Sequence, residues 1–77
     1  MKIKLSFVGY LELKGVKNGD VLELDEGTTV ADLLTQHNIR KEHQRHIIPI
    51  VNAEENRLSY TLQEADELTL FLPVGGG

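Results

Sequence analysis

The residues with the clearest chemical potential are the three consecutive glycines at the end of the chain, Gly75, Gly76 and Gly77. Glycine has no side chain, so the walls of a partner protein can approach its backbone closely. A terminal glycine carboxylate is unhindered, but any carboxylate is a poor electrophile until it is activated. A partner enzyme with ATP could adenylate it, which makes AMP the leaving group. The glycines therefore indicate a substrate-like tail, with a flexible end or an expression remnant as the alternative.

Pro73 and Val74 join these glycines to the preceding apolar run. Proline restricts the backbone, so Pro73 would stiffen the exit of the tail and lower the entropic cost of ordering it on a partner. A chain of 77 residues is long enough for only one small core. We therefore expect residues 1–72 to form one domain and residues 73–77 to form a flexible tail.

The histidines and paired acids are weaker candidates for chemistry. His43 and His46 have a spacing of i and i+3, but no carboxylate or thiol completes a convincing metal site around them. His37 fits better as a half-buried packing residue. The pair Asp66 and Glu67 has no nucleophile or base beside it and is expected to cap a turn. The chain also contains no cysteine. We expect no metal site and no catalytic centre, and therefore a carrier rather than an enzyme.

The charge balance limits the choice of partners. The chain has 12 acidic and 8 basic residues, and its net charge of −4 argues against nucleic-acid binding. From Glu54 to the end, the chain contains five acids against the single base Arg57, namely Glu54, Glu55, Glu64, Asp66 and Glu67. These acids indicate either an acidic surface beside the tail, which would attract a basic partner, or a solvated face. No signal segment or membrane-spanning run is apparent, so we expect a cytoplasmic protein without membrane contact.

The elements that must position the tail begin with a hairpin. Residues 2–7 alternate between polar and apolar side chains, as expected for a half-buried strand, and residues 21–24 alternate in the same way. Asn18 to Asp20, NGD, predicts the tight turn between them. Residues 10–15 are ambiguous, because they suit either a continued strand or a short helical turn that Gly15 closes.

A helix of about two turns is predicted after this hairpin. Thr29 and Asp32 have the spacing of a capping box. Val30, Leu33, Leu34 and His37 fall on one face, and Asn38 is suited to the left-handed conformation that ends a helix. Residues 37–46 then predict a polar, partly basic connection.

Three strands are predicted in the second half. Residues 47–51 form a short apolar run whose Pro49 cannot donate a hydrogen bond, so we expect this strand at a sheet edge or interrupted there. Residues 57–62 predict a weak strand. The last strand places Leu68, Leu70 and Leu72 inward, with Thr69 and Phe71 outward. The order predicts an α+β fold, in which one main helix covers a mixed sheet of four to five strands and the last strand lies beside the first.

These features together resemble the ThiS/MoaD family of sulfur carrier proteins. The resemblance covers the whole chain and rests on GTTVADLL, on VN before a turn, on ADELTLFLP and on the glycine end. It implies a ubiquitin-like β-grasp fold. It also implies that an E1-like enzyme adenylates Gly77 with ATP, and that a sulfurtransferase or cysteine desulfurase supplies sulfur for a C-terminal thiocarboxylate. A downstream synthase then consumes this group. No bound cofactor is implied.

Carried onto this sequence, the reacting atom belongs to Gly77, Gly76 is the second motif residue, and Gly75 is the variable position before it. We expect Phe71 and Thr69 to form the partner-docking surface. The insert GYLELKG and the proline of FLPVGGG favour molybdopterin or tungstopterin synthesis, with the synthase large subunit as acceptor. The family's usual double proline is a single Pro73 here. The alternatives are a thiamine carrier serving thiazole synthase, a ubiquitin-like protein modifier, or a β-grasp binding module whose tail has no role.

Overall fold

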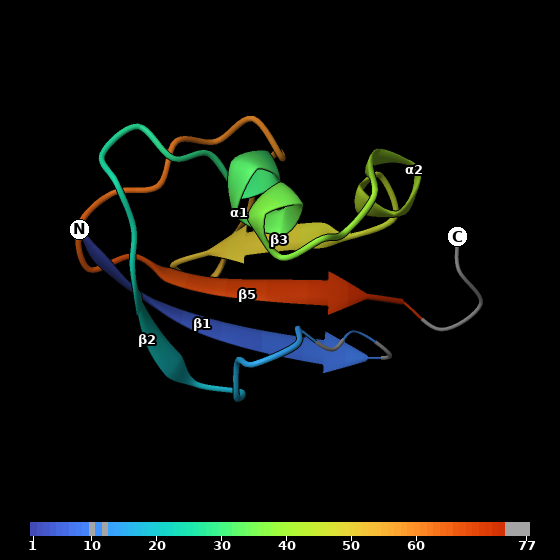
Figure 1. Ribbon diagram of the computed structural model, residues 1–77, viewed down its shortest axis with the longest axis horizontal. Helices are drawn as coiled ribbons and strands as arrows, with labels where there is room; N and C mark the ends of the chain where they lie inside the picture. Colours follow the sequence, from blue (N-terminus) through green and yellow to red (C-terminus); the bar gives the residue numbers. More distant parts are fainter. Residues whose placement is uncertain (10, 12, 74–77) are drawn as a thin grey trace.

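The computed structural model describes residues 1–9, 11 and 13–73 and folds them into five strands and two helices (Figure 1). The predicted capping-box helix is present, and the predicted strands are present except that of residues 57–62. The elements are β1 (Lys2–Gly9), β2 (Asp20–Glu23), α1 (Val30–Gln36), α2 (Lys41–Gln44), β3 (Ile48–Val51), β4 (Glu54–Glu55) and β5 (Glu67–Leu72).

The five strands form one mixed sheet in the order β2-β1-β5-β3-β4. Strands β1 and β5 are parallel, whereas β1 with β2, β3 with β5, and β3 with β4 are antiparallel. The last strand therefore lies beside the first in the middle of the sheet, which confirms the expected topology. A central strand makes backbone hydrogen bonds on both sides, so β5 is firmly held.

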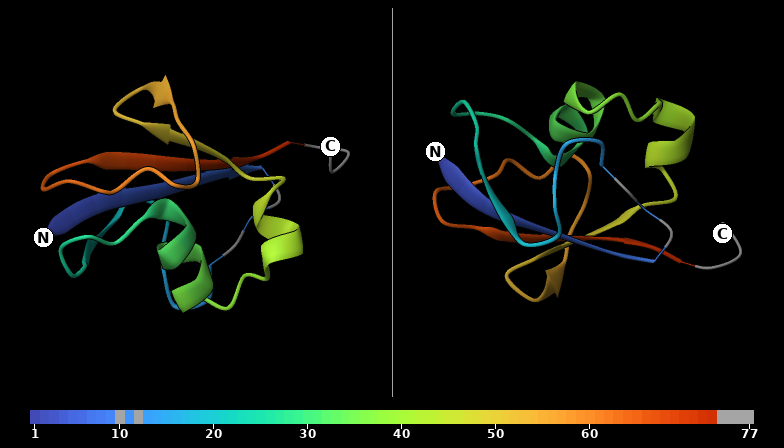
Figure 2. Two further views of the ribbon diagram at one scale, coloured as in Figure 1. Left: turned by 90° about the horizontal axis from the view of Figure 1, so that it is seen from above. Right: turned by 60° about the horizontal axis from the view of Figure 1, so that its bottom comes forward.

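Helix α1 covers one face of the sheet, as the two views of Figure 2 make clear. The capping box at its start is complete, since the Thr29 hydroxyl accepts from the Asp32 N–H and the Asp32 carboxylate accepts from the Thr29 N–H, both at 3.0 Å. Asn38 ends the helix region in the left-handed conformation, with φ of 64°. Both local signals in the sequence are confirmed.

The core lies between α1 and the sheet. Its buried apolar residues come from the helix, from alternate positions of β1 and β5, and from the connecting segments. They are Ile3, Leu5, Leu11, Leu13, Val30, Leu33, Leu34, Ile47, Val51, Leu62, Leu68 and Leu70. Leu72 is half-buried and packs against this cluster, so the inward side of the last strand is as predicted.

The polar connection after α1 contains a second helix, α2, which the sequence pattern did not indicate. The buried side chain of Gln44 explains why this short helix forms. Its Nε2 donates to the Thr35 hydroxyl at 2.9 Å and to the Ile39 carbonyl at 2.8 Å. These two bonds attach α2 to the end of α1, a long-range stabilisation that periodicity does not reveal.

The proline strand is not at a sheet edge, the first of the two expected arrangements, but its outer pairing stops before Pro49, which agrees with the second. Strand β3 is not an edge, because β4 lies outside it. The Pro49 carbonyl accepts from the Asn56 N–H at 2.8 Å, so the ring nitrogen faces this outer side rather than β5. Strand β4 pairs with only Ile50 and Val51, so it needs no N–H from Pro49. Because the ring nitrogen faces β4, the missing N–H also interrupts no pairing with β5.

The prediction of a weak strand over residues 57–62 is wrong. The short strand lies earlier, at β4, after a tight turn at Asn52 and Ala53, which both have positive φ angles. Within residues 57–62, Thr61 makes one isolated bridge with Thr29. Leu62 is nevertheless buried. The alternating apolar residues therefore mark a segment that packs under the helix without a strand partner.

The described residues of the ambiguous segment after β1 include a turn. Leu11 and Leu13 are buried in the core, and Lys14 and Gly15 form the turn. Tyr10 and Glu12 lie outside the described residues. Over the described part of this segment, neither a continued strand nor a helix is present. In the described part of the chain as a whole, no helix is long and apolar enough to cross a membrane.

Candidate functional site

The candidate site is the end of β5, where the tail leaves the sheet. Leu72 is the last residue of the strand, and the half-buried Pro73 follows it. The other predicted tail residues, Val74, Gly75, Gly76 and Gly77, lie outside the described residues. Because β5 is central, the base of the tail is fixed by pairing with β1 on one side and β3 on the other.

Gly9 meets the base of the tail at close range, and sequence reasoning did not identify it. It is the last residue of β1 and the parallel partner of Leu72. Its φ is +94°, a conformation that favours glycine. A Cβ at this position would also collide with the Leu72 carbonyl oxygen. Gly9 therefore lets β1 approach the point where the tail leaves β5.

Phe71 and Thr69 lie on the sheet face opposite the helix, as expected from the burial of Leu68 and Leu70 on the other face. Pairing brings further apolar residues beside them. Val8 is opposite Phe71 on one side and Ile48 is opposite it on the other, while Ile50 is opposite Thr69. We call Val8, Ile48, Ile50, Thr69 and Phe71 the outer patch.

The outer patch contains both predicted docking residues and three that the sequence did not single out. Val8 is 51% exposed, and the other four are half-buried. The patch extends to Phe71, two residues before Pro73. An apolar surface at this position has the chemistry of a protein-docking face. Only the pairing register reveals it, because its members come from three separate segments.

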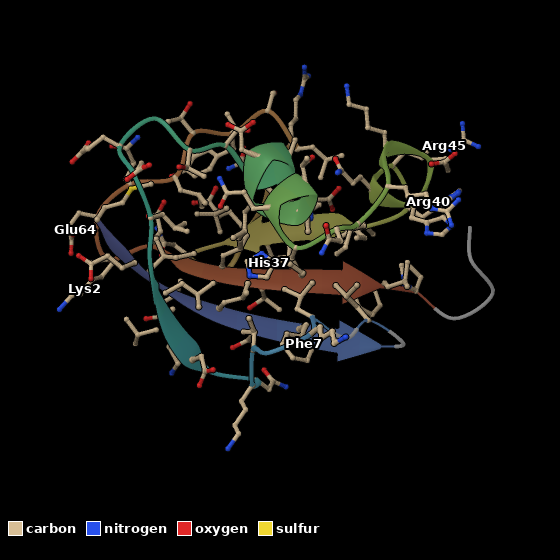
Figure 3. All side chains as sticks on the ribbon, viewed as in Figure 1. Lys2, Phe7, His37, Arg40, Arg45 and Glu64 are labelled. Atoms are coloured by element: carbon tan, nitrogen blue, oxygen red, sulfur yellow. The ribbon has the colours of Figure 1, made fainter. Side chains whose placement is uncertain are left out.

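The distribution of charge contradicts the expectation of an acidic surface beside the tail. Glu64 and Glu67 lie at the start of β5, whereas the tail leaves from its other end, about 17 Å away along the strand. Figure 3 places Glu64 and Lys2 at the end of the molecule opposite Arg40 and Arg45. The base of the tail is therefore on the side of the molecule that carries α2 and its basic residues.

The turn before β5 is held by the buried carboxylate of Asp66. It accepts hydrogen bonds from the Gln63 N–H at 2.8 Å, the Asn52 side chain at 2.9 Å and the Tyr60 hydroxyl at 2.9 Å. Burial alone would raise the pKa of Asp66, but these hydrogen bonds outweigh burial and hold the pKa below its usual value. Asp66 thus caps the turn, as expected.

The pKa of Tyr60, whose hydroxyl donates to this carboxylate, shifts in the opposite direction. Burial, the hydrogen bond to Asp66 and the negative charge of Asp66 together raise the pKa of Tyr60. Asn52 completes the network, because its Oδ1 accepts from the Glu67 N–H at 2.9 Å. The network sets the start of β5 and so supports the strand that carries the tail.

The histidines form no metal-binding group with other side chains among the described residues. His37 is half-buried at the end of α1, and its Nδ1 donates to the Leu33 carbonyl at 2.9 Å, which agrees with a packing role. Within residues 1–9, 11 and 13–73, no group of three or more potential metal-ligating side chains comes together.

Comparisons with known proteins place this fold and its tail in context. The ThiS family model matches residues 7–77. The crystal structure of SAMP1 from Haloferax volcanii is 26% identical, covers 100% of both chains and has a TM-score of 0.71. A structure of H. volcanii small archaeal modifier protein 1 is 25% identical with a TM-score of 0.66, covering 95% of this chain and 98% of that chain. No curated protein sequence matches significantly.

A putative molybdopterin converting factor subunit 1 from Pyrococcus furiosus has a TM-score of 0.68 over 95% of this chain and 98% of that chain. It is 24% identical, so the likeness concerns the fold alone. The shared architecture is the ubiquitin-like β-grasp, as the sequence resemblance implied. Because the family model spans nearly the whole chain, including β5 and the glycine tail, the chain belongs to the ThiS family.

Proposed function

We propose that the protein is a sulfur carrier whose reacting group is the carboxylate of Gly77. An E1-like enzyme joins this carboxylate to the α-phosphorus of ATP and releases pyrophosphate. The outer sulfur of a persulfide on a sulfurtransferase or cysteine desulfurase then displaces AMP and forms an acyl disulfide, and a second thiol cleaves its S–S bond, which releases the thiocarboxylate and leaves a disulfide between the two thiols. A synthase takes the sulfur from Gly77 in cofactor biosynthesis. The chain itself holds no cofactor, and the ATP is used by its partner.

The observation that carries this proposal is that Pro73, which leads into the glycines, directly follows the central strand. A substrate presented to another enzyme needs a rigid base and an unhindered end. Strand β5 is paired on both sides, and the glycines that follow Pro73 have no side chains. Family membership supports the same chemistry. The folded domain then acts as the handle by which a partner positions the tail.

The outer patch is the proposed docking face for these partners. It is apolar, and it ends two residues before Pro73, so a bound partner would receive both together. Among the acceptors, we favour the large subunit of molybdopterin synthase, in either the molybdenum or the tungsten pathway. Thiazole synthase of the thiamine pathway is the alternative. Since the activating enzyme consumes ATP, we place the reaction in the cytoplasm.

Mass spectrometry of the intact protein tests the proposal. The protein is incubated with the E1-like enzyme of its host, ATP and a sulfur source, and is also purified directly from that host. We expect a mass increase equal to the exchange of one oxygen for sulfur, located at Gly77 by fragmentation. Omitting ATP should abolish the increase. An unmodified Gly77 in the complete reaction, or a chain that continues beyond Gly77 in the host, would contradict the proposal.

Protein modification is the second candidate function. It is favoured by the similarity to H. volcanii small archaeal modifier protein 1, which is 25% identical over 95% of this chain and 98% of that chain. In this case a lysine amine of a target protein displaces AMP from the same activated Gly77 and forms an isopeptide bond. A proteomic search of the host for lysines carrying the glycine remnant decides the question. If no such adduct is found, protein modification is excluded and sulfur transfer remains as the proposed function.

A further inference from the structure

We propose that α2 and the residues beside it form a second docking surface, which binds an acidic surface of the E1-like protein that receives the tail. This inference rests on the proposed function. The surface consists of Arg40, Lys41 and Arg45, and we call these residues the basic cluster. It is distinct from the outer patch, which is apolar and lies on the opposite face of the sheet from the helices.

The basic cluster is a local reversal of the overall charge. The chain carries a net charge of −4, yet residues 37–48 contain three basic residues and one acid, Glu42. All three basic residues are exposed. Positive charge gathered at one site on an acidic molecule creates a field that attracts a partner of opposite charge in a defined orientation. A nucleic-acid partner is disfavoured, because the rest of the surface would repel it.

Three acids, Glu23, Glu64 and Glu67, lie at the other end of the molecule, where Lys2 and Lys4 lie as well. Glu23 pairs with Lys2 at the start of β1, Glu67 begins β5, and the Lys2 N–H donates to Glu64 at 3.0 Å. Figure 3 places Glu64 and Arg45 at opposite ends of the sheet. The basic cluster is therefore separated from these acids along the strand direction. An approaching acidic surface would meet the end from which the tail leaves.

The basic cluster lies close to the base of the tail. Arg45 precedes Ile48 by three residues, so their Cα atoms are at most ~11 Å apart. Ile48 is paired with Phe71, the residue before the last residue of β5. Figures 1 and 2 agree, since α2 lies on the same side of the molecule as the end of β5 in every view. A partner bound here would be within reach of Pro73.

The cluster is also presented rigidly. Gln44 is buried and donates to Thr35 and Ile39, and Ile47 is buried in the core directly after the helix. The backbone of α2 is thus held on both its inner side and its exit. A fixed basic surface loses less entropy on binding than a mobile loop with the same charges. This anchoring distinguishes the cluster from an ordinary solvated connection.

The test compares two charge-reversal variants that have the same net charge. One is R40E/K41E/R45E, and the control is K2E/K17E/R57E, which reverses three exposed basic residues outside the cluster. Binding to the host's E1-like enzyme is measured without ATP, and adenylation is followed by pyrophosphate release with ATP. Both are measured at low and high salt. Thermal unfolding of each variant confirms that it is folded, and R40Q/K41Q/R45Q provides a milder second variant.

At low salt, we expect the cluster variant to lose ~10-fold or more in association rate and in kcat/KM, with kcat unchanged. The control should lose much less, and the difference should nearly vanish at about 1 M salt, where charges are screened beyond ~3 Å. Equal losses in the two variants would contradict the proposed docking surface. Binding of a DNA probe by the wild-type protein that the cluster variant loses would contradict it as well. If the wild-type protein does not bind the enzyme, the docking surface is also wrong.

The same measurements separate this inference from the proposed function. If the wild-type protein is adenylated and the cluster variant behaves like the control variant, the carrier function is retained and the docking surface is excluded. If binding depends on the basic cluster but the competent enzyme does not adenylate the protein, the docking surface is supported and the carrier function is excluded.

Discussion

At the scale of single residues, the most constrained position beside the tail is Gly9. We expect Gly9→Ala to lower the free energy of unfolding by more than the ~1–2 kcal/mol that a left-handed alanine alone costs. The excess, about 1–3 kcal/mol for overpacking, arises because the new Cβ meets the Leu72 carbonyl. Urea unfolding measures the loss.

Gly19→Ala is the matched control for this substitution. Gly19 has nearly the same φ, +93°, but a Cβ there would have no neighbour within 4 Å. It should therefore show the conformational cost without the collision. Equal losses for the two variants would mean that the contact between Gly9 and Leu72 does not constrain the base of the tail.

Asp66 gives a second prediction at this scale, in the form of a pH dependence. Its pKa is depressed in the folded state, so its stabilisation is present above the unfolded pKa of about 3.9 and is lost as the pH falls through the folded value. We expect Asp66→Asn to lower stability by about 1–3 kcal/mol at neutral pH. The difference from wild type should shrink in acid, as measured by urea unfolding at several pH values.

Tyr60→Phe is the control for the Asp66 variant, because it removes one hydrogen bond and leaves the carboxylate ionised. This variant should lose less stability, because the two other hydrogen bonds to Asp66 remain. A difference between wild type and Asp66→Asn that stays constant down to strongly acidic pH would argue against a depressed pKa in this network.

At the scale of elements, helix α2 depends on one buried amide. We expect Gln44→Leu to leave the Thr35 hydroxyl and the Ile39 carbonyl without their donor and to cost about 1–3 kcal/mol. Hydrogen exchange of the Gln44 and Ile47 amides should accelerate more than that of the β5 amides. Gln36→Leu, an exposed substitution on α1, should leave this protection unchanged.

The paired strands lead to a prediction for the outer patch. We expect Phe71→Ser to reduce kcat/KM for adenylation by ~10-fold or more, because central apolar residues contribute most of the energy of a protein interface. Val21→Ser is the matched control, since Val21 is 64% exposed but lies on the edge strand β2, away from the end of β5. Similar losses for both variants would exclude the outer patch as the docking face.

At the scale of the whole molecule, the tail and the domain should be separable. Deleting Gly76 and Gly77 is expected to abolish thiocarboxylate formation, while the free energy of unfolding changes by less than about 0.5 kcal/mol. The shortened protein should still compete with the full chain for the E1-like enzyme, because both docking surfaces remain. A protein that keeps its cellular function after this deletion would be a binding module rather than a carrier.

The sequence alone determined the local parts of this protein. Alternation specified the faces of β1 and β5, Thr29 and Asp32 specified where the helix starts, and Asn38 specified where it ends. These features depend on residues within a few positions of one another, so a pattern can reveal them. The glycine tail and the family resemblance were likewise visible without coordinates.

The tertiary structure decided which distant residues meet. Strand register brought Gly9 to Leu72 and Val8 to Phe71, and the two bonds of Gln44 turned a polar connection into α2. The same packing placed the basic cluster, rather than the acids of residues 54–67, beside the base of the tail. Such neighbours depend on long-range pairing, for which no single stretch of sequence carries a periodic signal.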